Sequence, residues 1–194
     1  MSYARKRMIA VLGWGSLVWS PGELCLRSSW SRGGPSLPIE FSRISGKGHL
    51  TLVIDTTNGA PTMTRFATSC FDTIDPAVIN LRDRERTTLE NIGYVDLVTG
   101  RGCTRCVDLG AVGVWAENHR FNAVIWTDLE SNFEARRGEP FQVDAAIVHL
   151  RSLEAEESTV AFTYIKNSPV EVSTPVRRAA SSEWPDLGLA GIED

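Results

Sequence analysis

The irregular order of strand-like and helix-like segments is the feature that most constrains the fold of this 194-residue chain. Short apolar runs rich in β-branched residues predict strands, most clearly at residues 9–12 and 50–56. Strand and helix nevertheless never alternate in the regular way that builds a parallel sheet. The order predicts an α+β fold, with a mixed, mostly antiparallel, barrel-like sheet and flanking helices. The length fits a single domain spanning residues 1–194, or one domain with a C-terminal extension from about residue 100.

Turn residues separate the remaining strand candidates, which are residues 38–44, 62–71, 92–98, 110–117 and 121–129. Asn58-Gly59 is a strong hairpin signal, so we expect residues 50–56 and 62–71 to pair with each other. A second turn, around residues 118–120, is expected to join the last two candidates into another strand pair.

Helix signals are fewer. A helix is expected at residues 75–86, where Asp75 suits the N-cap and Pro76 the first helical position. Residues 141–157 carry apolar side chains at helical spacing and predict a second helix. Two later segments fit either a helix or an extended chain: residues 159–167 and 174–184.

The composition narrows the class of partner. Hydrophobic residues make up 42% and charged residues 23%, as in ordinary globular proteins. A formal net charge of -4 argues against nucleic acid, which needs a basic footprint. No apolar run reaches the roughly 20 residues of a membrane span, and the apolar run 8–12 is too short for a signal-peptide core. We therefore expect a cytoplasmic protein that binds neither nucleic acid nor a membrane.

Metal and redox motifs are weak. Cys103 and Cys106 form a CxxC motif in a glycine-rich, turn-like segment without a second pair of cysteines or histidines. Reduced thiols are the favoured interpretation, ahead of a redox motif, which should open a helix after a strand, and of a zinc site. The three histidines are scattered. No cofactor or metal is expected.

The first candidate for chemistry is the loop that follows the strand at residues 9–12. Its residues are Gly13, Trp14, Gly15, Ser16 and Leu17. If the glycines adopt positive φ, several backbone N–H groups point the same way and bind an anion or an oxyanion. The alternative is a tight structural corner that is filled by Trp14 and Trp19.

The second candidate is Glu85, at the end of the helix predicted for residues 75–86. It belongs to the alternating charged run 82–86, and such a run usually marks a solvated helix face. A glutamate that turned toward the sheet instead would have a raised pKa. It would then be a competent general base near neutral pH.

Together these segments resemble the γ-glutamylcyclotransferase-like superfamily. The resemblance rests on GWGSLVW at residues 13–19, LRDRE at residues 81–85 and IGYV at residues 92–95. The amino-acid sequence of the loop is most similar to that of the ChaC-type, glutathione-specific branch. The resemblance covers the first half of the chain, and residues from about 100 onward do not match the family's pattern. Two departures are Trp14, where the family has tyrosine, and a longer segment after Glu85, which makes Glu90 the reserve candidate.

The resemblance implies a mixed barrel with a cavity and a reaction without cofactor or metal. The substrate's own α-amine attacks its γ-carbonyl, and 5-oxoproline leaves together with an amine, amino acid or dipeptide. Residues 13–17 would contact the substrate through the backbone, and Glu85 would move the protons. Arg43 or Arg65 is the expected partner of a substrate carboxylate. A homodimer is left open.

Two alternatives stand beside this interpretation. In the first, the protein has the same fold but is not catalytic, and it binds a small metabolite or an interaction partner. In the second, it is a hydrolase or acyltransferase variant of the same fold. In the latter, water or an external amine would replace the internal α-amine.

Overall fold

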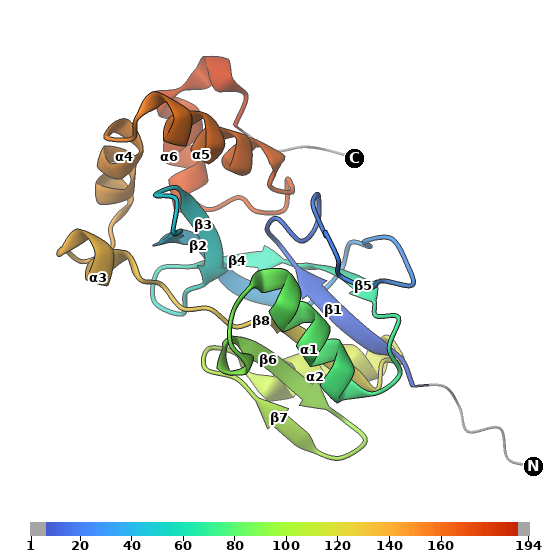
Figure 1. Ribbon diagram of the computed structural model, residues 1–194. Helices are drawn as coiled ribbons and strands as arrows, with labels where there is room; N and C mark the ends of the chain where they lie inside the picture. Colours follow the sequence, from blue (N-terminus) through green and yellow to red (C-terminus); the bar gives the residue numbers. More distant parts are fainter. Residues whose placement is uncertain (1–6, 190–194) are drawn as a thin grey trace, which may run out of the picture. The chain divides into compact units, whose positions relative to one another are not determined.

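The computed structural model describes residues 7–189 (Figure 1). These residues divide into two compact units, each assembled from separate stretches of the chain. The first unit contains residues 7–13, 21–35 and 64–128, and the second contains residues 14–20, 36–63 and 129–189. The single domain predicted from the length stays a prediction.

The first unit is built on a five-stranded sheet of order β5-β1-β8-β6-β7. Its strands are β1 (Ile9–Gly13), β5 (Arg65–Thr68), β6 (Ile92–Asp96), β7 (Arg101–Cys103) and β8 (Ala123–Thr127). Strand β1 pairs with β8 in parallel, and the other neighbours are antiparallel. The central strands are buried on both faces because a helix covers each face.

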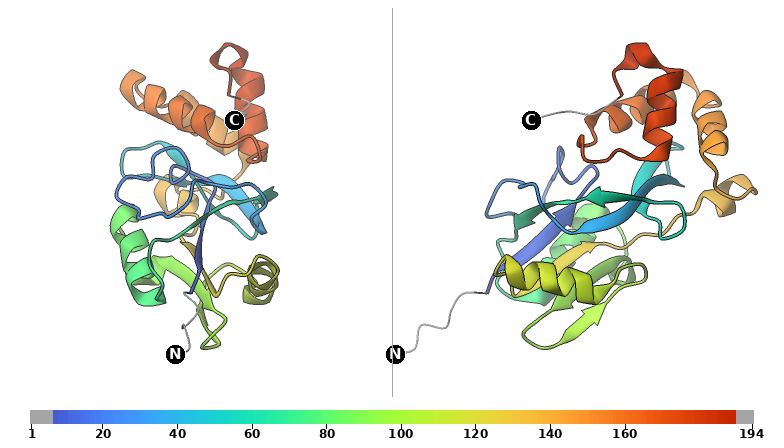
Figure 2. Two further views of the ribbon diagram at one scale, coloured as in Figure 1. Left: turned by 90° about the vertical axis from the view of Figure 1, so that its right-hand side faces the viewer. Right: turned by 180° about the vertical axis from the view of Figure 1, so that it is seen from behind.

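Those two helices are α1 (Ile74–Glu85) and α2 (Leu109–Asn118), which lie on opposite faces of the sheet (Figure 2). A short 3-10 turn, η1 (Leu89–Asn91), precedes β6. Helix α2 begins where the Asp108 carboxylate accepts hydrogen bonds from the Gly110 and Ala111 N–H groups, a side-chain N-cap. Its buried residues Val112 and Ala116 are four apart and face the sheet.

The second unit contains a three-stranded antiparallel sheet of order β3-β2-β4 and a group of helices. The strands are β2 (Ser36–Ile44), β3 (Leu50–Ile54) and β4 (Ala60–Met63). The helices are α3 (Phe133–Arg137), α4 (Val143–Arg151), α5 (Ala155–Asn167) and α6 (Pro175–Glu183), followed by the 3-10 turn η2 (Pro185–Leu187). Helix α6 packs on β2.

A buried arginine holds the helical part of the second unit together. Arg177 on α6 is only 2% exposed, and its guanidinium donates five hydrogen bonds, all to backbone carbonyl oxygens. The acceptors are Ile165, Ser168, Pro169, Val172 and Leu189. Burial lowers the pKa of Arg177 to about 10, so the side chain stays charged at neutral pH.

The predicted α+β class is confirmed, but the barrel is wrong, because within residues 7–189 the strands form two separate open sheets. The predicted hairpin of residues 50–56 and 62–71 is also wrong. Its second half divides at Thr64, so that β4 pairs with β2 and β5 pairs with β1. The turn at Gly59 packs directly against β2, so close that a Cβ would come within 2.4 Å of the Pro38 carbonyl carbon. The chain therefore crosses to the far edge of β2.

Two further predictions need correction. Residues 110–117 belong to helix α2 and not to a strand, since Asp108 caps the segment. The helix at residues 75–86 is confirmed, but its N-cap is Thr73, so Asp75 and Pro76 are the second and third residues of α1. Pro76 is tolerated there because the first N–H groups of a helix have no intrahelical acceptor. The segments left open at residues 159–167 and 174–184 are helical.

Among the described residues, no helix is both long enough and apolar enough to span a bilayer.

Candidate active site

Glu85 is the last residue of α1, and its carboxylate is largely withdrawn from solvent. The side chain is 16% exposed, and Oε1 lies 2.7 Å from Nη1 of Arg84. Arg84 also donates from Nε to the Pro21 carbonyl oxygen, which holds this end of α1 against residues 21–25 of the same unit. Glu85 is therefore a mostly buried, ion-paired carboxylate and not part of an open, solvated helix face.

Burial raises the pKa of Glu85 above that of an ordinary glutamate, while the Arg84 cation and its hydrogen bond pull the pKa down. The reserve candidate, Glu90, is exposed on η1. Only Glu85 of these two has the environment that tunes a carboxylate toward general acid–base work.

Arg65 is the first residue of β5, where it is the register partner of Gly13 at the end of β1. The Arg65 side chain is on the α1 face of the sheet. Its neighbour Phe66 meets Trp115 of α2 edge to face at 5.1 Å, and successive side chains of a strand point to opposite faces. Arg65 is only 5% exposed. Sequence alone did not distinguish it from Arg43.

Glu85 and Arg65 lie toward the same end of this sheet. Strand β5 is antiparallel to β1 and ends beside Ala10. Helix α1 then runs back along the sheet for 12 residues, about 18 Å at 1.5 Å per residue, which is close to the length of β1. The carboxyl end of α1 therefore lies toward the carboxyl end of β1, where Gly13 and Arg65 are paired (Figure 1).

The predicted loop is shared between the units: Gly13 ends β1 in the first, and residues 14–17 belong to the second. Trp14 and Leu17 are buried. The loop folds as a tight turn, with Val18 N–H donating to Gly15 O and Ser20 N–H to Ser16 O. Neither Gly13 nor Gly15 has a positive φ, so the condition set for an anion-binding nest is not met.

A steric reason accounts for Gly15. A Cβ at this position would lie 2.7 Å from the Tyr164 hydroxyl oxygen. The Tyr164 ring is itself held in a cluster of rings, with Trp19 at 5.1 Å, His49 at 5.7 Å and Phe41 at 6.3 Å between centroids. A Cβ at residue 15 would therefore require the Tyr164 hydroxyl to shift away from the loop backbone.

A buried glutamate in the second unit was not anticipated. Glu40 on β2 is fully buried, since both faces of this strand are covered. Its carboxylate accepts hydrogen bonds from the Phe41 and Val176 N–H groups, and Thr174 adds a side-chain hydrogen bond. Burial raises the pKa of Glu40. Because Thr174 and Val176 form the amino terminus of α6, Glu40 ties that helix to the sheet.

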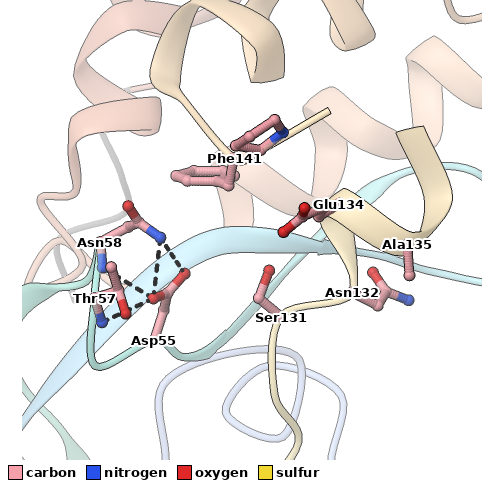
Figure 3. Close-up of a pocket in the computed structure, with 9 residues that line it drawn as sticks. Asp55, Thr57, Asn58, Ser131, Asn132, Glu134, Ala135 and Phe141 are labelled. Carbon is pink, nitrogen blue, oxygen red and sulfur yellow. Dashed lines mark hydrogen bonds between the residues drawn. The ribbon is translucent and has the colours of Figure 1, made fainter. Parts of the chain in front are cut away.

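The second unit also contains a pocket of about 630 Å³ (Figure 3). Asp55, Thr57 and Asn58 line one side, and Ser131 and Glu134 face them. Most of its polar groups already have structural partners. The Asp55 carboxylate accepts from the N–H groups of Thr57 and Asn58, and Ser131 donates to the Ser42 carbonyl at 2.6 Å.

The cysteines divide into two kinds. Cys25 and Cys70 form a disulfide in the first unit, which joins residues 21–35 to the chain after β5. Cys103 and Cys106 are thiols, as favoured from the sequence. Their motif begins at the end of β7 and precedes α2, and the Asp128 carboxylate accepts from Arg105 N–H at 2.5 Å. The motif therefore lies between a strand and a helix.

The remaining candidates lie elsewhere. Arg43 belongs to the second unit and donates from Nη1 to Glu130 O at 2.7 Å. Within residues 7–189, no group of three or more His, Cys, Asp or Glu side chains is arranged to hold a metal ion.

Comparison of the chain with protein-family models, curated proteins and solved structures found no match. The geometry and the sequence motifs are accordingly what an assignment of function rests on.

Proposed function

We propose that the chain is an intramolecular cyclotransferase of the γ-glutamylcyclotransferase-like type, which releases 5-oxoproline from a γ-glutamyl amide or peptide. One observation carries the proposal: Glu85, the glutamate of the LRDRE motif, is a mostly buried carboxylate with a raised pKa. A general base needs such a pKa to act near neutral pH.

In the proposed reaction, Glu85 accepts a proton from the α-ammonium group of the substrate. The freed amine attacks the γ-carbonyl carbon, and the negative charge that develops on oxygen requires N–H donors. The resemblance assigns this role to residues 13–17. Because neither Gly13 nor Gly15 has a positive φ, the donors would be individual backbone N–H groups and not a nest. The bond between the γ-carbon and the leaving nitrogen then breaks as Glu85 returns its proton to that nitrogen. The attacking nitrogen, which still carries two hydrogens and a positive charge, passes its second proton to the freed amine, so that the products are 5-oxoproline and a protonated amine. Attack within one molecule gains from holding both ends at reacting distance.

The proposal includes a small-molecule substrate as the partner, action in the cytoplasm, and no cofactor. The family's sequence pattern does not extend to the residues from about 100 onward. The proposal assigns these residues no role in the reaction, although they form α2 and β8 of the first unit and the helices of the second.

The test is to incubate the purified protein with a panel of γ-glutamyl compounds, including glutathione, and to measure 5-oxoproline. Glu85→Gln should lower kcat by about 100-fold or more, the usual contribution of a general base. Glu90→Gln is the matched control and should leave kcat unchanged. Release of glutamate would indicate the hydrolase variant, and transfer to an added amine the acyltransferase. Binding without turnover would indicate a metabolite-binding protein.

A further inference from the structure

The first unit contains a pocket of about 260 Å³ that the proposed reaction does not use. The first two turns of α1 and the turn η1 form one side of the pocket, and alternate residues of β6 and β7 form the other. Asp75 lines the pocket near the start of α1, whereas Glu85 ends that helix. The helix rises about 15 Å between these two residues, so the pocket is separate from the Glu85 carboxylate.

The strand side of the pocket follows from the register of β6 and β7. Tyr94 and Cys103 are directly opposite each other, so their side chains share one face of the sheet. Gly102 belongs to the other face, because a Cβ there would lie 2.9 Å from Cδ1 of Leu109 on α2. Side chains alternate along a strand, and Arg101 and Cys103 therefore both point to the α1 face. A phenol, a guanidinium and a thiol thus lie together at this pocket.

The helix side of the pocket is apolar and only partly covered. Ile74 and Val78 are four residues apart on α1 and lie on the same side of the helix. Ile79 of α1 and Leu89 of η1 also line the pocket, and they are 43% and 50% exposed. Large apolar side chains that remain open to solvent around one pocket are typical of a site that binds an apolar group.

Two groups of opposite charge accompany this apolar wall. Nη2 of Arg101 lies 3.5 Å from the Tyr94 hydroxyl oxygen, and no carboxylate of residues 7–189 pairs with Arg101. Within the same residues, the Asp75 carboxylate has no cationic partner. Both residues are exposed, so both charges are accessible to a ligand. Asp75 would repel a simple anion and Arg101 a simple cation, whereas a zwitterion complements both.

We propose that this pocket binds a free α-amino acid with an apolar side chain. Arg101 and the Tyr94 hydroxyl bind the carboxylate, since the planar guanidinium matches a carboxylate in a bidentate manner. Asp75 binds the ammonium group, and the side chain of the ligand lies against the apolar residues of α1. The inference does not depend on the cyclotransferase reaction.

The first measurement is calorimetric titration with L-valine, L-leucine and L-phenylalanine, with L-serine as the polar control. The tightest ligand is then compared with its analogue lacking the ammonium group and its analogue lacking the carboxylate, each of which should bind at least about tenfold more weakly. Arg101→Met should remove the preference over the amine, and Asp75→Asn the preference over the acid. Arg27→Met, on an exposed arginine of the same unit, is the control. Asp75 and Arg101 are exposed, so their variants should melt like wild type.

Cys103 reports where the ligand binds. In a Cys106→Ser variant, Cys103 is the one cysteine outside the Cys25–Cys70 disulfide, and it is exposed. The amino acid should slow alkylation of Cys103 by iodoacetamide with the concentration dependence found by calorimetry. Glu85→Gln should bind the amino acid as wild type does, which distinguishes this pocket from the site of the proposed reaction.

Three results would each overturn the inference. The first is that none of the three apolar amino acids binds. The second is binding that leaves the alkylation of Cys103 unchanged. The third is binding that keeps its preference for the intact amino acid in both Arg101→Met and Asp75→Asn.

Discussion

Nη1 of Arg84 lies 2.7 Å from Oε1 of Glu85, the next residue on α1. The two influences on this carboxylate oppose each other: burial favours its protonated form, and the adjacent guanidinium favours the ionised form. Burial is the larger of the two, so the pKa of Glu85 stays above its ordinary value. The raised pKa makes the ionised Glu85 carboxylate a stronger proton acceptor than an ordinary glutamate.

Arg84→Met should move the acid limb of the pH–rate profile to higher pH. The base form of Glu85 is required, so kcat/KM rises with pH through the pKa of Glu85, and loss of the cation raises that pKa further. The profile of 5-oxoproline release measures the limb. Arg82→Met is the control, since Arg82 pairs with Asp83. An acid limb at the same pH in both variants would contradict the role of the ion pair.

Gly15→Ala should disturb the loop, because the new Cβ would meet the Tyr164 hydroxyl oxygen at 2.7 Å. Overpacking of this kind costs about 1–3 kcal/mol, and a displaced loop should also slow turnover. The double variant Gly15→Ala/Tyr164→Phe should recover most of the loss, since it removes the atom that clashes. Thermal unfolding and kinetics of the three variants measure this. A double variant no better than Gly15→Ala would show that the contact is not the cause.

Glu40 should make the second unit less stable as pH rises. Its folded pKa is raised above the ordinary glutamate value, so the folded state holds the proton more tightly than the unfolded chain. The stabilisation is present below the ordinary pKa and is lost as pH rises through the raised value. Glu40→Gln should therefore reduce the fall in the free energy of unfolding as pH rises from below the ordinary glutamate pKa through the raised pKa of Glu40, measured by urea titration at a series of pH values. An equal fall in the variant would rule this out.

Arg177→Leu should be strongly destabilising. It removes the donor to five backbone carbonyl oxygens that join α5, α6 and the chain up to Leu189. The expected loss in the free energy of unfolding is at least about 3 kcal/mol, because each buried acceptor that is left without a donor costs about 1–3 kcal/mol. Arg178→Leu, at the exposed neighbouring position, is the control and should cost less than about 1 kcal/mol. Comparable losses in both variants would mean that burial of Arg177 is not responsible.

The Cys25–Cys70 disulfide should stabilise the first unit under oxidising conditions. It closes a loop with a sequence separation of 45, for which chain entropy gives at most about 4 kcal/mol. Melting with and without reductant, and a Cys70→Ser variant that should be insensitive to reductant, measure the contribution. The bond also tests the predicted cytoplasmic location, since such disulfides belong to oxidising compartments. Mass spectrometry of the protein from its native compartment would decide whether the thiols are paired there.

Local patterns were sufficient for several elements. The apolar run at residues 9–12 forms β1, residues 38–44 lie within β2, and residues 50–54 of the predicted strand form β3. Helix α1 was also predicted to within two residues at its start. Glu85 and the loop at residues 13–17 were selected from motifs and resemblance.

One of the wrong secondary-structure predictions could have been avoided from the sequence. Asp108 is a good N-cap directly before an apolar stretch, which predicts a helix and not the strand we expected at residues 110–117. No sequence signal indicated that Glu40 is buried, because a glutamate that alternates with Ile39 and Phe41 along a strand is expected to face solvent. It is buried only because helix α6 covers that face of β2.

The sequence by itself determined where strands and helices form, because apolar periodicity, caps and turn residues act within a few positions of the chain. Tertiary structure decided the pairing of strands, the division of residues 60–68 between two sheets, and the meeting of Cys25 with Cys70. It also decided that Arg65 and not Arg43 lies beside Gly13. Those outcomes depend on register and burial between distant segments, which local preferences do not encode.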